Sequence, residues 1–67
     1  MMYEKLKEER ELQHYTMEDM ARVIDKSVAN YSMKENGKVK FSVCEALMIA
    51  DFLNKKVEEL FKRSDLQ

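Results

Sequence analysis

Apolar residues recur at helical spacing in five short segments of this chain, with polar turn residues between them. The segments lie at about residues 3–13, 17–24, 28–35, 43–53 and 57–62. Thr16, Ser27 and Ser42 precede the second, third and fourth segments, where a hydroxyl can accept a hydrogen bond from the first turn of a helix. Asn36 and Gly37 end the third segment, because glycine takes the left-handed conformation after a helix at little cost. The pattern therefore predicts five helices.

The fourth segment differs from the others because nine of its twelve positions from 43 to 54 are apolar. On a helical wheel, one face that we expect to be buried consists of Val43, Ala46, Leu47, Ala50 and Leu53. A second stripe, nearly opposite, consists of Cys44, Met48 and Phe52. Together with Phe61, this stripe is predicted to be a partner surface, because so short a chain has little protein to cover both faces. The expected core draws on every segment: Leu6, Tyr15, Met20, Ala21, Ile24, Tyr31, Leu47, Ala50, Leu53, Val57 and Leu60.

Composition narrows the fold and excludes most site chemistry. The 67 residues are enough for one domain, which we place at residues 1–67. One glycine and no proline argue against a small β-sandwich or barrel, and no Gly-x-Gly motif is present to bind phosphate. His14 and Cys44 are the only histidine and the only cysteine, too few for a zinc site. We therefore expect an all-α domain with no metal, no cofactor and no enzymatic activity.

The same sequence predicts a cytoplasmic protein that does not contact a membrane. Its longest apolar run, residues 46–50, is far shorter than the roughly 20 residues of a membrane-spanning helix. The first residues contain no apolar signal region. The polar tail at residues 63–67 is expected to fray.

Charge is unevenly distributed, although the net charge is only −1. Residues 26–40 contain four lysines and one glutamate, which gives this segment a charge of +3, whereas residues 1–25 sum to −3. A locally basic segment can dock on a polyanion even when the whole chain is near neutral. Two short helices joined by a tight turn lead directly into it.

These features resemble the Cro/repressor (XRE-like) helix-turn-helix family of phage and bacterial regulators. The positions that carry the resemblance are Leu6, Arg10, Thr16, Glu18-Asp19-Met20-Ala21, Ile24, Ser27, Tyr31-Ser32, Glu35-Asn36-Gly37-Lys38, Leu47, Ala50, Leu53, Val57 and Glu59-Leu60-Phe61. The resemblance implies a five-helix, lambda-repressor-like domain with its helix-turn-helix at about residues 17–35. It also implies that Arg10 and Glu35 form a partly buried ion pair.

The resemblance further implies a double-stranded DNA operator as the partner. Candidates for reading bases are Ser27, Val28, Ala29, Asn30, Ser32 and Met33. Candidates for contacting phosphates are Met17, Lys26, Lys34, Asn36, Lys38 and Lys40. The chain departs from the family pattern at Met17, which replaces the usual glutamine, and at His14 and Asp25, which replace glycines. The largest departure is at the base-reading positions, where Val28, Ala29 and Met33 stand in place of polar side chains.

Two functions remain open at this point. The first is a sequence-specific, Cro-like transcriptional regulator of phage or prophage origin, acting as a homodimer at least on DNA. Lys55 and Lys56 stand where the family's subunits meet, so we expect weak dimerisation in solution. The second is a helix-turn-helix modulator or antirepressor that binds another regulator protein, because Val28, Ala29 and Met33 make an apolar recognition face.

Overall fold

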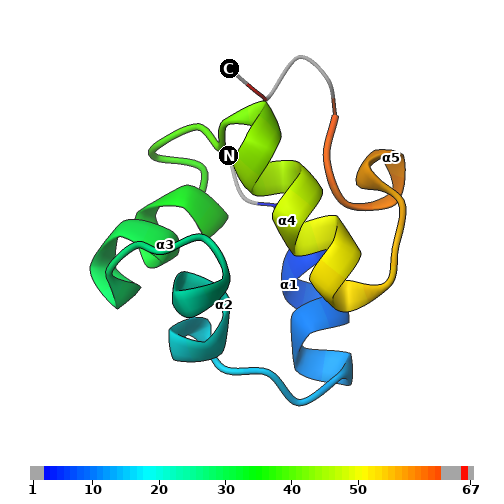
Figure 1. The fold of residues 1–67 in the computed structure, drawn as a ribbon, viewed down its shortest axis with the longest axis horizontal. Helices are drawn as coiled ribbons and strands as arrows, with labels where there is room; N and C mark the ends of the chain where they lie inside the picture. Colours follow the sequence, from blue (N-terminus) through cyan, green and yellow to red (C-terminus); the bar gives the residue numbers. More distant parts are fainter. Residues whose placement is uncertain (1–2, 63–65, 67) are drawn as a thin grey trace.

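Five α-helices account for most of the chain in the computed structural model, which describes residues 3–62 and Leu66. They are α1 (Glu4–Leu12), α2 (Met17–Val23), α3 (Val28–Glu35), α4 (Val43–Leu53) and α5 (Val57–Leu60). Helix α4 runs between the α2–α3 pair on one side and α1 with α5 on the other (Figure 1). The described residues contain no strand beyond an isolated parallel bridge between Phe41 and Leu66. The prediction of an all-α, five-helix domain is confirmed.

Of the tail at residues 63–67, the structure describes Leu66 alone. Residues 63–65 and 67 lie outside the described part of the chain, so the expected fraying there stays a prediction. Leu66 is described, and it is half-buried against the core next to Phe41.

Each of the three predicted hydroxyl caps is present. Thr16 Oγ1 accepts a hydrogen bond from the Asp19 N–H at 3.1 Å, and the Asp19 carboxylate accepts one from the Thr16 N–H at 2.9 Å. Ser42 and Glu45 form the same reciprocal capping box at the start of α4. Ser27 Oγ accepts from the third residue of α3. These bonds satisfy N–H groups that have no partner within the helix, and they fix where the helices begin.

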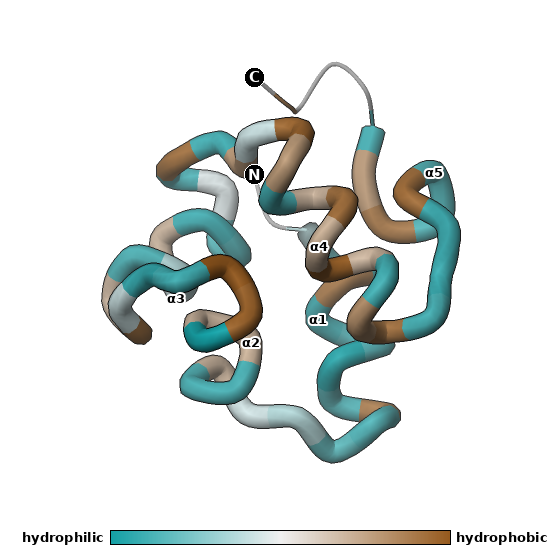
Figure 2. The backbone as a smooth tube through the Cα atoms, in the orientation of Figure 1, coloured by the Kyte–Doolittle hydropathy of each residue, from teal (hydrophilic) through white to brown (hydrophobic). Residues whose placement is uncertain are grey.

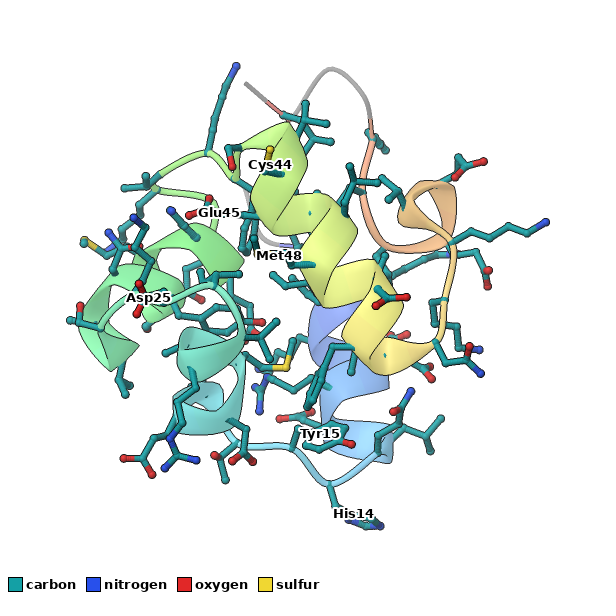
Figure 3. The ribbon with its side chains drawn as sticks, viewed as in Figure 1. His14, Tyr15, Asp25, Cys44, Glu45 and Met48 are labelled. Atoms are coloured by element: carbon teal, nitrogen blue, oxygen red, sulfur yellow. The ribbon has the colours of Figure 1, made fainter. Side chains whose placement is uncertain are left out.

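Among the described residues, three that are not glycine adopt the left-handed backbone conformation at helix ends. The φ angles are 63° at His14, 56° at Asp25 and 58° at Asn54. His14 and Asp25 are the two positions where the resemblance implies glycine, and both lie in connecting turns (Figure 3). Side chains with a Cβ make this conformation less favourable by roughly 1–2 kcal/mol. The chain therefore keeps the turn geometry without the residue that favours it.

The core is built around aromatic rings as well as aliphatic side chains. Phe41, in the loop between α3 and α4, is fully buried and lies edge-on to Tyr3, Tyr31 and Phe61 at ring-centroid distances of 5.3, 6.0 and 5.1 Å. Phe61 is 5% exposed, so its prediction as part of a partner surface is wrong. Its ring is held by Phe41 and by Tyr3, which is 5.5 Å away. Such edge-to-face pairs add to the stabilisation from burial.

Helix α4 is rotated relative to the predicted orientation. Its buried side consists of Glu45, Ala46, Ile49, Ala50 and Leu53. Leu47, predicted to be in the core, is 54% exposed, and Val43 is 49% exposed. The helical wheel of α4 does not define a single buried side, because hydrophobic residues occupy most of this helix, whereas α1 is mostly hydrophilic (Figure 2). When a helix is apolar on all sides, tertiary contacts determine which side is buried.

Candidate nucleic-acid interface

The outward side of α3 has no charged side chain. Helical spacing places Val28, Ala29, Ser32, Met33 and Asn36 on this side. Val28 and Met33 are 44% and 41% exposed, and Ala29 and the N-cap Ser27 are also exposed. Ser32 and Asn30 are half-buried. Four of the six candidates for base reading therefore lie at the surface, and the other two lie at its edge.

Two amide side chains of α3 differ in their hydrogen bonding. Asn36 Nδ2 donates to the carbonyl oxygen of Ser32 at 2.9 Å and so stabilises the last turn of α3. The Asn30 Oδ1 atom is buried and accepts no hydrogen bond from the described residues. The Oδ1 acceptor of Asn30 is therefore enclosed by the protein, and the exposed part of this half-buried side chain is what can reach a base.

Exposed lysines lie in the chain segments on both sides of α3. Lys26 is in the turn before the helix, and Lys38 and Lys40 are in the loop after it. This loop folds back onto α3, because the carbonyl oxygen of Met33 accepts hydrogen bonds from the N–H groups of Lys38, at 2.9 Å, and Val39, at 3.3 Å. Three cations thus border an uncharged face, an arrangement in which lysines can bind phosphates while α3 faces the bases.

Lys34 does not belong to this basic border, contrary to the prediction that it contacts phosphate. It is 6% exposed, and its Nζ donates to both carboxylate oxygens of Glu45, at 2.8 and 2.7 Å. Glu45 points from α4 toward α3 (Figure 3). Burial alone would raise the pKa of Glu45, but the hydrogen bonds from Lys34 and from the Ser42 N–H outweigh it and lower that pKa. Lys34 therefore ties α3 to α4.

A second buried ion pair ties the last turn of α3 to α1. Arg10 Nε and Nη2 donate to the two oxygens of Glu35 at 2.8 and 3.1 Å, which is the pair that the resemblance implies. The Tyr31 hydroxyl donates to Glu35 at 2.8 Å, and Arg10 Nη1 donates to the carbonyl oxygen of Tyr15 at 2.9 Å. The hydrogen bond to Glu35 raises the pKa of Arg10, and burial raises the pKa of Tyr31. This network holds α3 in a fixed orientation on the domain.

Met17, the remaining candidate for phosphate contact, has a packing role. It is half-buried and lies against the core at the start of α2. A thioether has no hydrogen-bond donor for a phosphate oxygen. The side chain is therefore not suited to the role that glutamine has at this position in the family.

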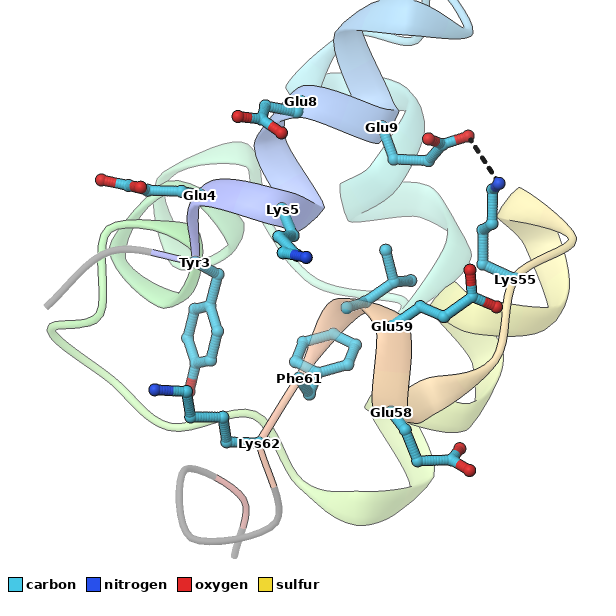
Figure 4. A pocket seen from close by; sticks show the side chains of 11 residues that line it. Tyr3, Glu4, Lys5, Glu8, Glu9, Lys55, Glu58, Glu59, Phe61 and Lys62 are labelled. Carbon is cyan, nitrogen blue, oxygen red and sulfur yellow. Dashed lines mark ion pairs between the residues drawn. The ribbon is translucent and has the colours of Figure 1, made fainter.

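A groove lies between α1 and α5 and is lined in part by Leu60, Phe61 and Tyr3 (Figure 4). This groove of about 640 Å³ has an acidic rim, because it carries five glutamates and three lysines: Glu4, Glu8, Glu9, Glu58, Glu59, Lys5, Lys55 and Lys62. Lys55 pairs with Glu9 at 3.7 Å. The excess of carboxylates makes this side unsuitable for DNA and leaves α3 as the candidate interface.

Sequence reasoning missed two residues that matter to this interface. Glu45 is recognisable as a capping residue from the Ser42-Val43-Cys44-Glu45 motif, but nothing local signals its bond to Lys34. Val39, 38% exposed, lies between the two border lysines and adds apolar surface beside Met33.

Residues 6–60 match a protein-family profile described as Helix-turn-helix. No curated protein and no solved structure gives a significant match to the chain. None of the described helices is both long enough and apolar enough to span a membrane. The described residues also contain no group of three His, Cys, Asp or Glu side chains placed to hold a metal ion.

Proposed function

The chain belongs to the helix-turn-helix family of DNA-binding regulators, and on this basis we propose that it is a small, sequence-specific transcriptional regulator of the Cro/repressor type, of phage or prophage origin. The observation that carries the proposal is the uncharged, exposed side of α3 between Lys26 and the Lys38–Lys40 loop. The two ion pairs at Lys34 and Glu35 support it, because they hold α3 in one orientation.

Base reading falls to a mainly apolar set of side chains. Val28, Ala29 and Met33 cannot make the bidentate hydrogen bonds by which arginine or glutamine identifies a base pair. They can contact the methyl group of thymine, which projects into the major groove. Asn30 and Ser32 supply the hydrogen-bonding groups. The proposed operator is therefore rich in A·T pairs at the positions that α3 covers.

Affinity comes from Lys26, Lys38 and Lys40, which contact phosphates without regard to sequence. Three such contacts and one short helix give limited affinity, so two copies bind together on a two-fold symmetric site. The proposed assembly is a homodimer on DNA.

A gel-shift assay tests this function. The probe is duplex DNA that flanks the protein's own gene, at low salt, with and without the product of the neighbouring regulator gene. The proposal predicts a shift by the protein alone, with saturation at two copies per site. A shift that needs the second regulator, or an effect only on that regulator's own complex, contradicts it.

One observation favours a second function, a modulator or antirepressor that binds another regulator protein. Val28, Met33 and Val39 together expose an apolar surface, and the outward side of α3 carries no charged side chain. Such a surface is also typical of a protein contact. The same gel-shift assay separates the two functions, because a modulator changes the complex of the other regulator without binding the probe.

A further inference from the structure

The outer face of α4 exposes more large apolar side chains than any other helix face of the described chain. We define the α4 outer face as Val43, Cys44, Leu47, Met48, Asp51 and Phe52, all of which are exposed. Its four large apolar side chains are between 39% and 54% exposed. Asp51 is its one charged residue, whereas exposed residues of α1, α2 and α5 are mostly charged. An apolar face of this kind on a small domain marks a site of association.

We propose that the α4 outer face pairs with the same face of a second copy of this chain. A face with one charge in six residues has nothing to attract a strongly charged partner, but its own copy offers an equally apolar surface of equal length. The four large side chains would bury on the order of 400 Å² per copy, about half of the roughly 800 Å² per partner of a standard interface. The pairing is therefore weak in solution and gains from a shared DNA site.

The position of Asp51 selects an antiparallel arrangement of the two helices. In a parallel pair, each Asp51 would face its copy and the like charges would repel. In an antiparallel pair with its two-fold axis between Leu47 and Met48, Asp51 lies opposite Cys44 of the second copy. The two Asp51 residues are then about 10 Å apart along the helix axes, from a rise of about 1.5 Å per residue. The large Phe52 lies opposite the smaller Val43, which suits close packing.

An aromatic contact between Phe52 and Tyr15 makes one end of the α4 outer face rigid. The Phe52 ring packs against Tyr15 in a tilted arrangement, with the ring centroids 4.5 Å apart and the ring planes at 46°, so it is held in place before any partner arrives. Cys44 and Met48 lie along α4 in Figure 3, away from the Asp25 turn that leads into α3. The α4 outer face begins at Val43, three residues after the border lysine Lys40, and extends from there along the helix to Phe52.

This inference rests on the proposed function in one respect, which is that a dimer would present two α3 helices to DNA. The pairing itself can be measured without DNA. Sedimentation velocity of the full chain, between about 10 μM and 1 mM, measures it. The variant Met48→Lys places a charge at the centre of the face, and Leu12→Lys changes a residue on α1 that is 72% exposed. We expect the wild type and Leu12→Lys to associate alike, and Met48→Lys to associate at least tenfold more weakly with unchanged helical circular dichroism.

Disulfide trapping tests the antiparallel arrangement. Under oxidising conditions the variant Cys44→Ser with Met48→Cys is expected to form covalent dimers, because position 48 lies beside the two-fold axis. The native Cys44 is expected to form few, because the two copies would lie about 10 Å apart along the axes. Rapid cross-linking through Cys44 instead would overturn the antiparallel arrangement.

Two further outcomes complete the test. A wild type that stays monomeric at about 1 mM, or a Met48→Lys variant that associates as well as the wild type, overturns the pairing. A wild type that dimerises but binds no duplex keeps the pairing and removes the proposed function. In a DNA titration, Met48→Lys is expected to bind a single half-site as the wild type does and to lose the doubly occupied complex.

Discussion

Lys34 of α3 and Glu45 of α4 form a buried ion pair in which the ammonium donates to both carboxylate oxygens, at 2.8 and 2.7 Å. The same carboxylate accepts the Ser42 N–H at 3.0 Å and so caps α4. One side chain thus defines the start of α4 and fixes its position against α3. The orientation of both the candidate DNA interface and the α4 outer face depends on it.

Breaking this pair is expected to destabilise the domain strongly. Lys34→Met leaves the buried Glu45 without its cation and should lower the free energy of unfolding by about 3 kcal/mol. Adding Glu45→Gln should restore part of that loss, because the glutamine side chain can still accept the hydrogen bond from the Ser42 N–H and leaves no buried charge. Urea denaturation of the two single variants and the double variant gives the coupling energy. The control Arg22→Ala removes an exposed pair with Glu18 and should cost no more than about 1 kcal/mol; an equal cost for both lysine and arginine variants would contradict the structural role of Lys34.

Stability should fall with acidification through Glu45. Its pKa in the folded domain is lowered, so below the ordinary value of 4.5 the unfolded chain binds more protons than the folded one. The stabilisation from this carboxylate is complete above that value and is lost as the pH falls through the lower folded pKa. The variant Glu45→Gln should therefore show a flatter dependence of melting temperature on pH between 5 and 3. Parallel curves for the two proteins would show that Glu45 does not carry the effect.

Glycine at position 25 is expected to stabilise the turn between α2 and α3. Asp25 has φ of 56°, a conformation that glycine adopts without the clash of a Cβ. Asp25→Gly should raise the free energy of unfolding by about 1 kcal/mol, or the melting temperature by about 4–8 °C in a domain of this size. Asp25→Ala serves as the comparison and should not stabilise. If alanine and glycine behave alike, the loss of a charge rather than the backbone conformation is responsible.

Lysine and apolar substitutions should affect DNA binding in different ways. Lys38→Ala and Lys40→Ala should weaken binding to every duplex and each reduce the slope of log affinity against log salt by about one. Val28→Ala and Met33→Ala should instead change the preference at individual A·T pairs. Lys62→Ala, on the α1–α5 side, is the matched control and should change neither quantity. Fluorescence anisotropy at several salt concentrations measures all five variants.

The helices and their starting points could be predicted from the sequence, because their signals are local. Thr16, Ser27 and Ser42 are hydroxyl residues next to apolar periodic segments, and all three cap helices. The pairing of Arg10 with Glu35 is not local, since 25 residues separate them. It could be anticipated only through the resemblance to a known family.

The errors arose where tertiary contacts decide between two acceptable local solutions. Leu47 and Ile49 are both apolar, so the local pattern does not decide which of them is buried. In the structure the side of α4 that holds Ile49 turns inward, and Glu45 on the same side binds Lys34 of α3. Lys34 belongs by sequence to the basic segment 26–40, which predicts a phosphate contact, and nothing local signals its bond to Glu45. Phe61 was assigned to the surface because Phe41, its main aromatic contact, lies in a loop for which the sequence predicts no packing.

Whether α3 reads double-stranded DNA is measured by selection from a random duplex library. The wild type is incubated with the library at about 50 mM salt, a concentration at which phosphate contacts are strong, and the bound duplexes are sequenced. We expect enrichment of a two-fold symmetric site whose half-sites contain thymines, and a changed preference for the double variant Val28→Ala with Met33→Ala. Recovery of no sequence above its frequency in the starting library, by a protein that is folded by circular dichroism, would contradict the account.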